Sequence, residues 1–331
     1  MIYYVDKERK VFDIGRIDTE TKAFMSDPSH FADAFNYLIY DGQTVIKPEN
    51  LKPLDTTEIA IPYGNNARVP EQKYRDVLKL LTAMRDHEAI YAVLGVENQT
   101  KVHYAMPVKN MQYDASNYAQ QVIAAKKSYG KEDRLTSEEF LSGFRKGDKL
   151  MPVITLVIYF GASEWDGPIC IHDMLNTNNK RLLSFVPDYR INLIAPALVP
   201  DEDFEKFSTD FRDVLQFIKC SKDEESLTRL AEGNERFARM NPETAELINM
   251  ITDSKLKLNV EEGKVNMCQA IQQMREHSEA TGVAKGKTEG RLETLVSLLK
   301  KNRLNLEEAA EEAAMTVDEF VKKTGMKPVM N

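Results

Sequence analysis

Two short runs of almost uninterrupted apolar residues stand out in the first half of the chain. AIYAVLGVE spans Ala89–Glu97 and MPVITLVIYFG spans Met151–Gly161, and both contain β-branched and aromatic residues. Runs of this length and composition are typical of strands buried within a sheet. Between them, apolar residues recur at intervals of three and four from Met111 to Ala125, with Gly130 just beyond, which predicts a helix. Strand, helix and strand in that order predict a crossover unit packed on one sheet.

Residues 1–70 contain one amphipathic run, inside HFADAFNYLIYDG. Its large apolar residues are at helical spacing, and Asp41-Gly42 follows as a stop signal; these residues are Phe31, Phe35, Leu38 and Ile39. The next segment is rich in Pro, Gly and Asn, which predicts a loop with one short strand around Glu58–Ile61.

Beyond residue 200 the pattern changes to helices with recognisable ends. Ser221-x-x-Glu224 and Thr316-x-x-Glu319 fit the capping box, and Asn241-Pro242 fits an N-cap followed by proline at the first helical position. The tail predicts two short helices around a turn at Met315-Thr316.

Three glycines recur every four residues in TGVAKGKTEGRLETL, at Gly282, Gly286 and Gly290. A helix with this spacing can pack closely against a partner helix, but each glycine also weakens the helix by about 1 kcal/mol relative to alanine. Two interpretations therefore stay open: a flexible helical linker, or a helix through which copies of the chain associate.

The composition bears on the cellular compartment of the protein and on whether its cysteines bind zinc or form disulfides. The chain is 42% hydrophobic and 29% charged, and it has no apolar stretch long enough to cross a membrane. Its first residues, MIYYVDKERK, do not resemble a secretory signal. The cysteines (Cys170, Cys220 and Cys268) show no CxxC spacing, so we expect reduced thiols in a cytoplasmic protein and neither zinc nor disulfides.

The net charge of −8 does not by itself suggest a polyanionic partner. The charge is unevenly distributed, however. Residues 101–150 carry nine Lys and Arg against six Asp and Glu, whereas residues 201–250 carry seven against thirteen. The acidic excess lies mostly outside the half that holds the predicted strands, so phosphate binding there is not excluded.

The segment before the first apolar run predicts a candidate site. If strands begin near Tyr74 and Ala89 and are joined by a hairpin at Asp86-His87, opposed residue numbers sum to about 173, and Asp76 lies opposite Glu97 at about 5 Å between Cβ atoms. Side chains alternate along a strand, so Gln99 and Lys101 are expected on the same face as Glu97. Paired carboxylates suit a hard cation such as Mg²⁺ or Mn²⁺.

Other interpretations of this segment remain open. Tyr74, Val77, Leu78 and Leu81 also fit a helical stripe, which would leave Asp76 as a solvated charge. Asp55 is a rival for the first acid, although its surroundings favour a turn. The histidines are scattered, and none is paired at metal-ligand spacing.

An acidic residue, a hairpin and then Glu-x-Lys form the signature of the PD-(D/E)XK nuclease superfamily. Glu97-x-Gln99 resembles the variant found in its recombination-promoting nuclease and transposase family. The resemblance extends over most of residues 17–325, and the segments that carry it are HFADAFNYLIYDGQTVIKPENL, LGVENQTKVHYAMPVKNMQYDASNY, KLMPVITLVIYFGASEWDGPICIHDML and the glycine-spaced helix.

The resemblance implies a restriction-endonuclease-like α/β fold, a mixed sheet flanked by helices, in residues 17–200. A helical region would follow over 201–281, and then a glycine-spaced helix and small helical tail over 282–331. It also implies that Asp76 and Glu97 hold Mg²⁺ or Mn²⁺, with Gln99 as the third site residue. Gln99 is a neutral amide where the superfamily has lysine, so we expect Lys101, rather than Lys109 beyond the strand, to supply the missing charge. The superfamily's Gln-x-x-x-Tyr helix motif is missing in that form, and the candidates on the equivalent helix are Tyr113, Asn117, Tyr118 and Gln121.

The expected activity is metal-dependent hydrolysis of DNA phosphodiesters, leaving 5′-phosphate and 3′-hydroxyl ends, with a role in recombination, mobile elements or host defence. Two other hypotheses stand beside it. One is a non-catalytic DNA-binding or assembly protein on a degenerate nuclease fold, and the other is a nuclease that acts on RNA.

Overall fold

The structure is a computed structural model, and it describes residues 15–54, 57–60, 71–74, 76–85, 88–130, 134–301 and 303–326. The chain divides into two compact units, Met1–Met267 and Cys268–Asn331. They are called here the sheet unit and the C-terminal unit. The boundary between them falls inside the segment 201–281 that the sequence pattern sets apart.

Strands in the described part of the chain all belong to the sheet unit. They are β1 (Leu51–Pro53), β2 (Thr57–Ala60), β3 (Glu71–Tyr74), β4 (Val77–Arg85), β5 (Glu88–Gln99), β6 (Val153–Tyr159), β7 (Asn192–Ile194), β8 (Val260–Glu261) and β9 (Lys264–Val265). Among the described residues, five strands form a mixed sheet in the order β1-β4-β5-β6-β7, while β2-β3 and β8-β9 form two-stranded ribbons. This confirms the predicted mixed α/β architecture.

The hairpin of β4 and β5 has the register that the sequence predicted. The two strands are antiparallel, with Leu80 opposite Val93, and the pairing runs from Val77 opposite Val96 to Arg85 opposite Glu88. Residues 77–85 are therefore a strand and not the alternative helix. Val77 and Leu78 lie on opposite faces of this strand and both are buried, as expected for a sheet that is covered on both faces. The predicted turn at Asp86-His87 lies outside the described residues.

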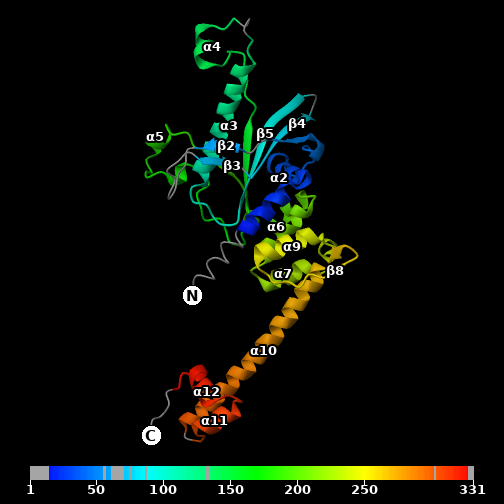
Figure 1. Ribbon diagram of the computed structural model, residues 1–331, viewed down its shortest axis with the longest axis vertical. Coiled ribbons are helices and arrows are strands. Elements are labelled where there is room, and N and C mark those ends of the chain that lie inside the picture. The colour runs from blue at the N-terminus through cyan, green and yellow to red at the C-terminus, as the bar shows by residue number, and fades with distance from the viewer. Residues whose placement is uncertain are drawn as a thin grey trace. The chain divides into compact units, whose positions relative to one another are not determined.

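The predicted crossover is confirmed. Strand β5 runs parallel to β6, with Glu97 opposite Val157 and Gln99 opposite Tyr159, and β6 runs parallel to β7. Helix α3 (Met106–Ser128) connects the first two strands and ends shortly before Gly130. Figure 1 shows α3 and α2 on different sides of the sheet, with α6 next to α2.

Polar residues fasten α3 to the sheet. The Thr155 hydroxyl donates to Oδ1 of Asp114 at 2.6 Å, and the Tyr189 hydroxyl donates to Oδ2 at 2.6 Å. Gln121 hydrogen bonds to both the backbone N–H and the carbonyl of Met151. Because buried polar groups must keep hydrogen-bond partners, these pairs fix the position of α3 along β6.

Helix α2 (Pro28–Tyr40) packs against β4, where the Lys79 ammonium lies over the Phe31 ring, and α6 (Asp210–Cys220) packs against α2. Helix α2 ends as predicted at Asp41, which adopts the left-handed conformation. The buried Asp33 of α2 accepts hydrogen bonds from the backbone and hydroxyl groups of Ser208 and Thr209, where α6 begins. This contact fixes the start of α6 against α2 within the sheet unit.

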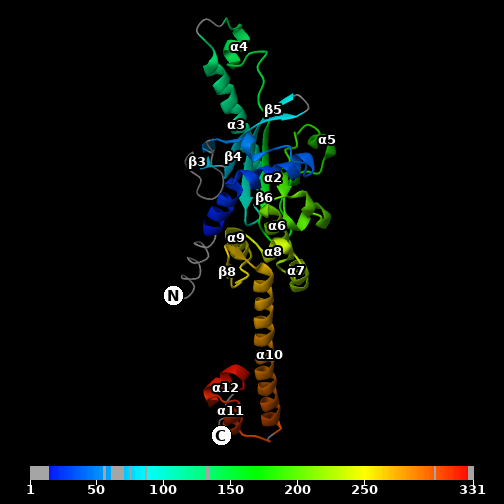
Figure 2. The ribbon, with the colours of Figure 1, turned by 90° about the vertical axis from the view of Figure 1, so that its right-hand side faces the viewer.

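The remaining helices of the sheet unit are short, apart from a helix over residues 15–26. They are α4 (Ser137–Ser142), α5 (Lys180–Leu183), α7 (Glu224–Ala231), α8 (Glu235–Ala238), α9 (Pro242–Thr252) and the 3₁₀ turns η1 (Pro48–Asn50), η2 (His172–Met174), η3 (Pro196–Leu198) and η4 (Asp201–Lys206). Figure 2 shows the same elements from the side. None of the described helices is both long and apolar enough to cross a membrane.

Two of the three predicted helix starts are confirmed. Asn241 caps α9, with Pro242 at its first position, and Thr316 and Glu319 form a capping box at α12. The capping box predicted at Ser221 is wrong. Ser221 ends α6, and Asp223 caps α7 by accepting a hydrogen bond from the backbone of Ser226. A carboxylate two residues later in the chain is the alternative acceptor that the motif overlooked.

The C-terminal unit is helical, as predicted. Helix α10 (Met267–Lys300) is followed by α11 (Leu306–Glu312) and α12 (Val317–Thr324), on either side of the expected turn. The end of α10 packs with the two short helices around a core of Leu295, Ala309, Ala310 and Phe320. Residues 275–291 of α10, which include the three spaced glycines, are exposed throughout.

Candidate active site

Two carboxylates lie at the open end of the β4–β5 hairpin. The ladder ends with Val77 opposite Val96; Asp76 precedes β4 in a bend, one residue before the strand on which it was predicted, and Glu97 is on β5. The Oδ2 atom of Asp76 accepts a hydrogen bond of 2.8 Å from the backbone N–H of Asn98, which holds the Asp76 side chain across β5. Glu97 is only 1% exposed, so its charge lies in the interior of the sheet unit.

Lys109, in the first turns of α3, lies against Glu97. Its Nζ is 2.6 Å from Oε2 of Glu97, and the lysine side chain is 20% exposed. The same ammonium lies 5.7 Å from the centre of the Tyr113 ring, one turn further along α3. A buried carboxylate needs a cation or several donors nearby, and Lys109 meets part of that need.

Asp76 is less easily ionised than an ordinary aspartate. Burial raises its pKa, and this effect outweighs the hydrogen bond from Asn98 and the positive charges of Lys109 and Lys22, which lower the pKa. Asp18, which is on the helix over residues 15–26 with Lys22, raises it further. The surroundings therefore disfavour a second negative charge beside Glu97 unless more positive charge is supplied.

Gln99 and Lys101 lie at the end of β5. Gln99 is its last residue, and the Gln99 side-chain N–H donates to the carbonyl of Asn98 at 2.8 Å. Lys101 follows in an exposed bend, so the strand alternation that predicted its direction stops two residues before it. Its assigned role stays a prediction. Asp55, the rival acid, lies outside the described residues.

The other polar candidates on α3 mainly hold the helix in place. Tyr118 accepts a hydrogen bond from the backbone of Val153, and Gln121 bonds to Asn117 and to the backbone at Met151. Tyr113 is 3% exposed and packs beside Lys109. Sequence reasoning missed Lys109 as a site residue. No local pattern distinguishes it from the other lysines, because the contact depends on how the crossover helix lies against the strand that carries Glu97.

Two buried amides near these charges have no hydrogen-bond partner for their side-chain atoms among the described residues. Asn98 follows Glu97 on β5, and Asn110 follows Lys109 on α3. Unsatisfied buried amides cost about 1–3 kcal/mol each and are uncommon in folded proteins. Their position next to the charged residues is the kind of local cost that functional sites retain.

Asp76 and Glu97 are the carboxylates that a Mg²⁺ or Mn²⁺ ion would use at this site. Mg²⁺ is commonly bound through one or two carboxylates, with water and substrate phosphate completing its shell. Asp76 and Glu97 supply that number. No group of three or more His, Cys, Asp and Glu residues with metal-site geometry occurs in the described part of the chain, so an all-protein cage is not what these residues offer. The residues fit an ion that shares its coordination with substrate.

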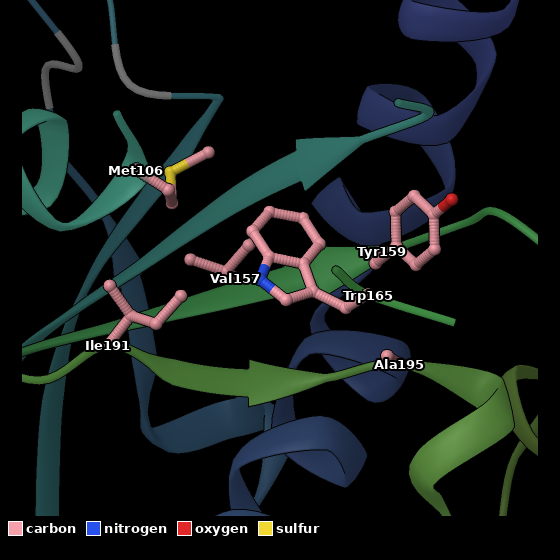
Figure 3. Packing of buried hydrophobic residues seen from close by; sticks show 6 residues of the cluster. All are labelled: Met106, Val157, Tyr159, Trp165, Ile191 and Ala195. Atoms are coloured by element: carbon pink, nitrogen blue, oxygen red, sulfur yellow. The ribbon is translucent and has the colours of Figure 1, made fainter. Parts of the chain in front are cut away.

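The loop after β6 forms an aromatic wall against the sheet. Trp165 is 8% exposed and packs against Val157, Tyr159 and Met106, as Figure 3 shows. Its ring meets that of Tyr159 edge to face, with centroids 5.4 Å apart. Gly161 allows this packing, because a Cβ at that position would collide with the Tyr159 phenol ring.

No family model matches this chain, and no curated protein or solved structure is detectably similar to it.

Proposed function

We propose that this protein is a Mg²⁺- or Mn²⁺-dependent endonuclease that hydrolyses DNA phosphodiester bonds, as its resemblance to the recombination-promoting nuclease and transposase family of PD-(D/E)XK nucleases implies. The observation that supports the proposal best is the arrangement at the hairpin end. Asp76 and Glu97 flank the last pair of the hairpin ladder, Val77 and Val96, and Lys109 is ion-paired with Glu97.

Under this proposal Asp76 and Glu97 hold the divalent ion. When bound, the ion would activate a water molecule and neutralise charge that develops on the phosphate. The raised pKa of Asp76 is consistent with a cation-binding site, because a cation beside the carboxyl would favour its ionised form and lower the pKa. Gln99 contributes an uncharged amide at the third position.

In this proposal Lys109, and not Lys101, supplies the positive charge that the neutral Gln99 cannot supply. Its ammonium orients the Glu97 carboxylate, and it brings a positive charge to the face of the sheet where the scissile phosphate would lie. The lysine comes from the crossover helix rather than from the strand. This arrangement would compensate for Gln99, since a nearby ammonium stabilises negative charge far better than a neutral amide does.

One observation favours the second hypothesis, a non-catalytic DNA-binding protein on a degenerate nuclease fold. The Glu97–Lys109 pair also satisfies the ordinary demand that a buried carboxylate be neutralised, with no metal involved. In that case the pair stabilises the fold, and the chain would bind DNA without cleaving it.

Nicking of supercoiled plasmid DNA separates the two hypotheses. We expect cleavage with Mg²⁺ or Mn²⁺, none with EDTA, and losses of about 10²-fold or more for Glu97→Gln and Asp76→Asn. The matched control is Glu202→Gln, an exposed carboxylate of η4, which should cleave normally. Binding without metal-dependent cleavage would establish the second hypothesis, and cleavage of RNA in preference to DNA would establish the third.

A further inference from the structure

A cavity with both polar and apolar lining residues lies beyond the carboxyl ends of β5 and β6. It has a volume of about 710 Å³, and its walls come from residues that follow β5, residues that follow β6, and the ends of α6 and α9. Small-molecule sites commonly measure about 300–1,000 Å³. This space suits one or two nucleotides and is too small for a duplex. Gln99 and Tyr159, the last residues of the two strands, pair at its edge.

An aromatic ring is presented at the cavity. Tyr104 is 62% exposed, far more than most large hydrophobic or aromatic residues of the sheet unit, and it lines the cavity. Its hydroxyl donates to both carboxylate oxygens of Asp166, at 3.2 and 3.3 Å. The Asp166 charge raises the pKa of Tyr104, which keeps the phenol protonated and the hydrogen bond intact. The ring is thus held at one end while its faces stay open for stacking.

The charged groups of the cavity are mixed in sign. Lys101 and Lys222 supply two ammonium groups, and the Lys222 Nζ donates to the Ser163 hydroxyl at 2.6 Å. Glu164 and Asp166 supply two carboxylates on the loop after β6. A ligand that matches this lining needs an anion for the lysines, N–H donors for the carboxylates and a flat face for Tyr104. A nucleotide carries all three.

We propose that this cavity binds an unpaired nucleotide of the DNA strand that is cut. The inference rests on the proposed function for its choice of DNA, and it extends that function to the class of substrate. Base stacking on an exposed aromatic ring and lysine contacts to phosphate are the usual means of holding single-stranded DNA. The cavity adjoins the strand that carries Glu97, since its lining residue Tyr159 pairs with Gln99 and Lys101 follows two residues later.

Binding in EDTA tests the cavity without requiring cleavage. The probes are a short fluorescein-labelled DNA strand of mixed sequence and the same strand annealed to its complement, followed by fluorescence anisotropy. We expect the single strand to bind about tenfold more tightly than the duplex. Tyr104→Ala should weaken single-strand binding about tenfold, because stacking on one aromatic ring commonly contributes about 1–3 kcal/mol per base.

Two matched variants distinguish stacking from a structural role. Tyr104→Phe keeps the ring and loses the bond to Asp166, so it should bind almost normally. Phe140→Ala removes another exposed aromatic ring, 75% exposed on α4, and should leave binding unchanged. Lys222→Gln gives an independent readout that does not depend on how Tyr104→Ala folds, because the slope of log K against log salt should fall by about 0.7 for one lost phosphate contact.

Equal affinity for the single strand and the duplex would overturn the inference. Equal effects of Tyr104→Ala and Phe140→Ala on binding would also overturn it, as would a salt slope that Lys222→Gln leaves unchanged. Failure of the proposed function looks different. In that case the single strand binds through Tyr104 in EDTA, but plasmid DNA is not cleaved when Mg²⁺ or Mn²⁺ is added.

Discussion

The Nζ atom of Lys109 lies 2.6 Å from Oε2 of Glu97, although one residue is on the first turns of a helix and the other near the end of a strand. The crossover from β5 into α3 creates this contact. The chain turns back over the sheet soon after the strand ends, so the first turns of α3 face the last residues of β5. A lysine in these turns can pack its aliphatic stem on the sheet while its ammonium reaches the carboxylate.

Lys109→Ala is expected to reduce both DNA cleavage and stability. Cleavage should fall about 10²-fold or more, because the positive charge beside Glu97 is lost. Unfolding in urea should show a loss of about 3 kcal/mol, since Glu97 would keep a buried charge without its cation. Lys109→Arg should recover part of both.

The paired comparison is Lys101→Ala. Lys101 is exposed beyond the strand, so its removal should leave the stability unchanged. If Lys101→Ala abolishes cleavage and Lys109→Ala does not, the strand lysine supplies the charge, as the sequence pattern first indicated.

Asp76→Asn is expected to raise the melting temperature at neutral pH while abolishing cleavage. Burial raises the pKa of Asp76 above its ordinary value of 3.8. The folded protein therefore prefers the protonated carboxyl. This stabilising contribution is complete below pH 3.8 and is lost as the pH rises through the raised pKa. The asparagine does not titrate, and its carbonyl can still accept the Asn98 hydrogen bond.

The control for this pH dependence is Asp148→Asn. A hydrogen bond from Tyr129 lowers the pKa of Asp148, so here the sign is reversed. The carboxylate stabilises the fold above its ordinary pKa, and this stabilisation is lost as the pH falls through the lowered value. Asp148→Asn should therefore lower the melting temperature at neutral pH. A shift of the melting temperature in the same direction for both variants at every pH would contradict this prediction.

The strands could be predicted because their pattern is local and repeated. Continuous apolar runs at Ala89–Glu97 and Met151–Gly161 have few alternatives to a buried strand, and Gly130 marks the end of the helix between them. The hairpin register followed from one assumption, the position of the turn, since every pair in an antiparallel ladder has the same sum of residue numbers. This is why the pairing of residues 77–85 was correct although helical periodicity competed with it.

The Lys109–Glu97 contact could not be predicted in this way. It depends on the angle at which α3 leaves the strand, which no local pattern encodes. The same holds for the cavity at Tyr104, whose walls come from segments as far apart as Thr100 and Thr252. The wrong capping box at Ser221 had a different cause: Asp223 offers a carboxylate for the same purpose, and sequence spacing does not rank the two acceptors.

Thr155→Val should destabilise the protein without changing its shape. The substitution keeps the volume but removes the hydroxyl that donates to Asp114 at 2.6 Å, and both residues are buried. A lost hydrogen bond to a charged group commonly costs about 1.5–3 kcal/mol. Urea unfolding measures the loss, and Thr288→Val, on the exposed part of α10, should change stability by no more than about 0.5 kcal/mol. A nearly neutral Thr155→Val would show that α3 is held mainly by apolar packing.

Gly161→Ala should distort the wall made by Tyr159 and Trp165. An added Cβ would overlap the Tyr159 phenol, and overpacking of this kind commonly costs about 1–3 kcal/mol. Gly147→Ala is the matched control, because a Cβ there meets open space. Thermal unfolding and tryptophan fluorescence, which reports only Trp165, should both change in the first variant and not in the second. The same fluorescence in both variants would mean that the Tyr159 ring can move aside for the added Cβ without disturbing Trp165.

Truncation within the glycine-spaced part of α10 tests whether the sheet unit carries the chemistry alone. A chain ending near Gly282 keeps the whole sheet unit and the buried first residues of α10, Met267, Ala270 and Ile271. It loses only the C-terminal unit's own core around Leu295 and Phe320. We expect this chain to fold cooperatively and to keep metal-dependent nicking, but to associate less with itself or to bind DNA more weakly in sedimentation and anisotropy measurements. A chain that fails to fold would show that the division near Met267 does not separate independent units.

The glycines themselves decide between the two interpretations of this helix. Residues 275–291 are exposed throughout, and a Cβ at Gly282, Gly286 or Gly290 meets nothing within 4 Å, so alanine fits at each position. Replacing all three should strengthen the helix by about 1 kcal/mol per site, because glycine has the greater backbone freedom to lose. If the segment is a linker, hydrogen exchange there should slow while self-association stays the same. If copies of the chain associate through this helix, the added methyl groups would hold the backbones apart, and sedimentation should show that the self-association of the intact chain is lost.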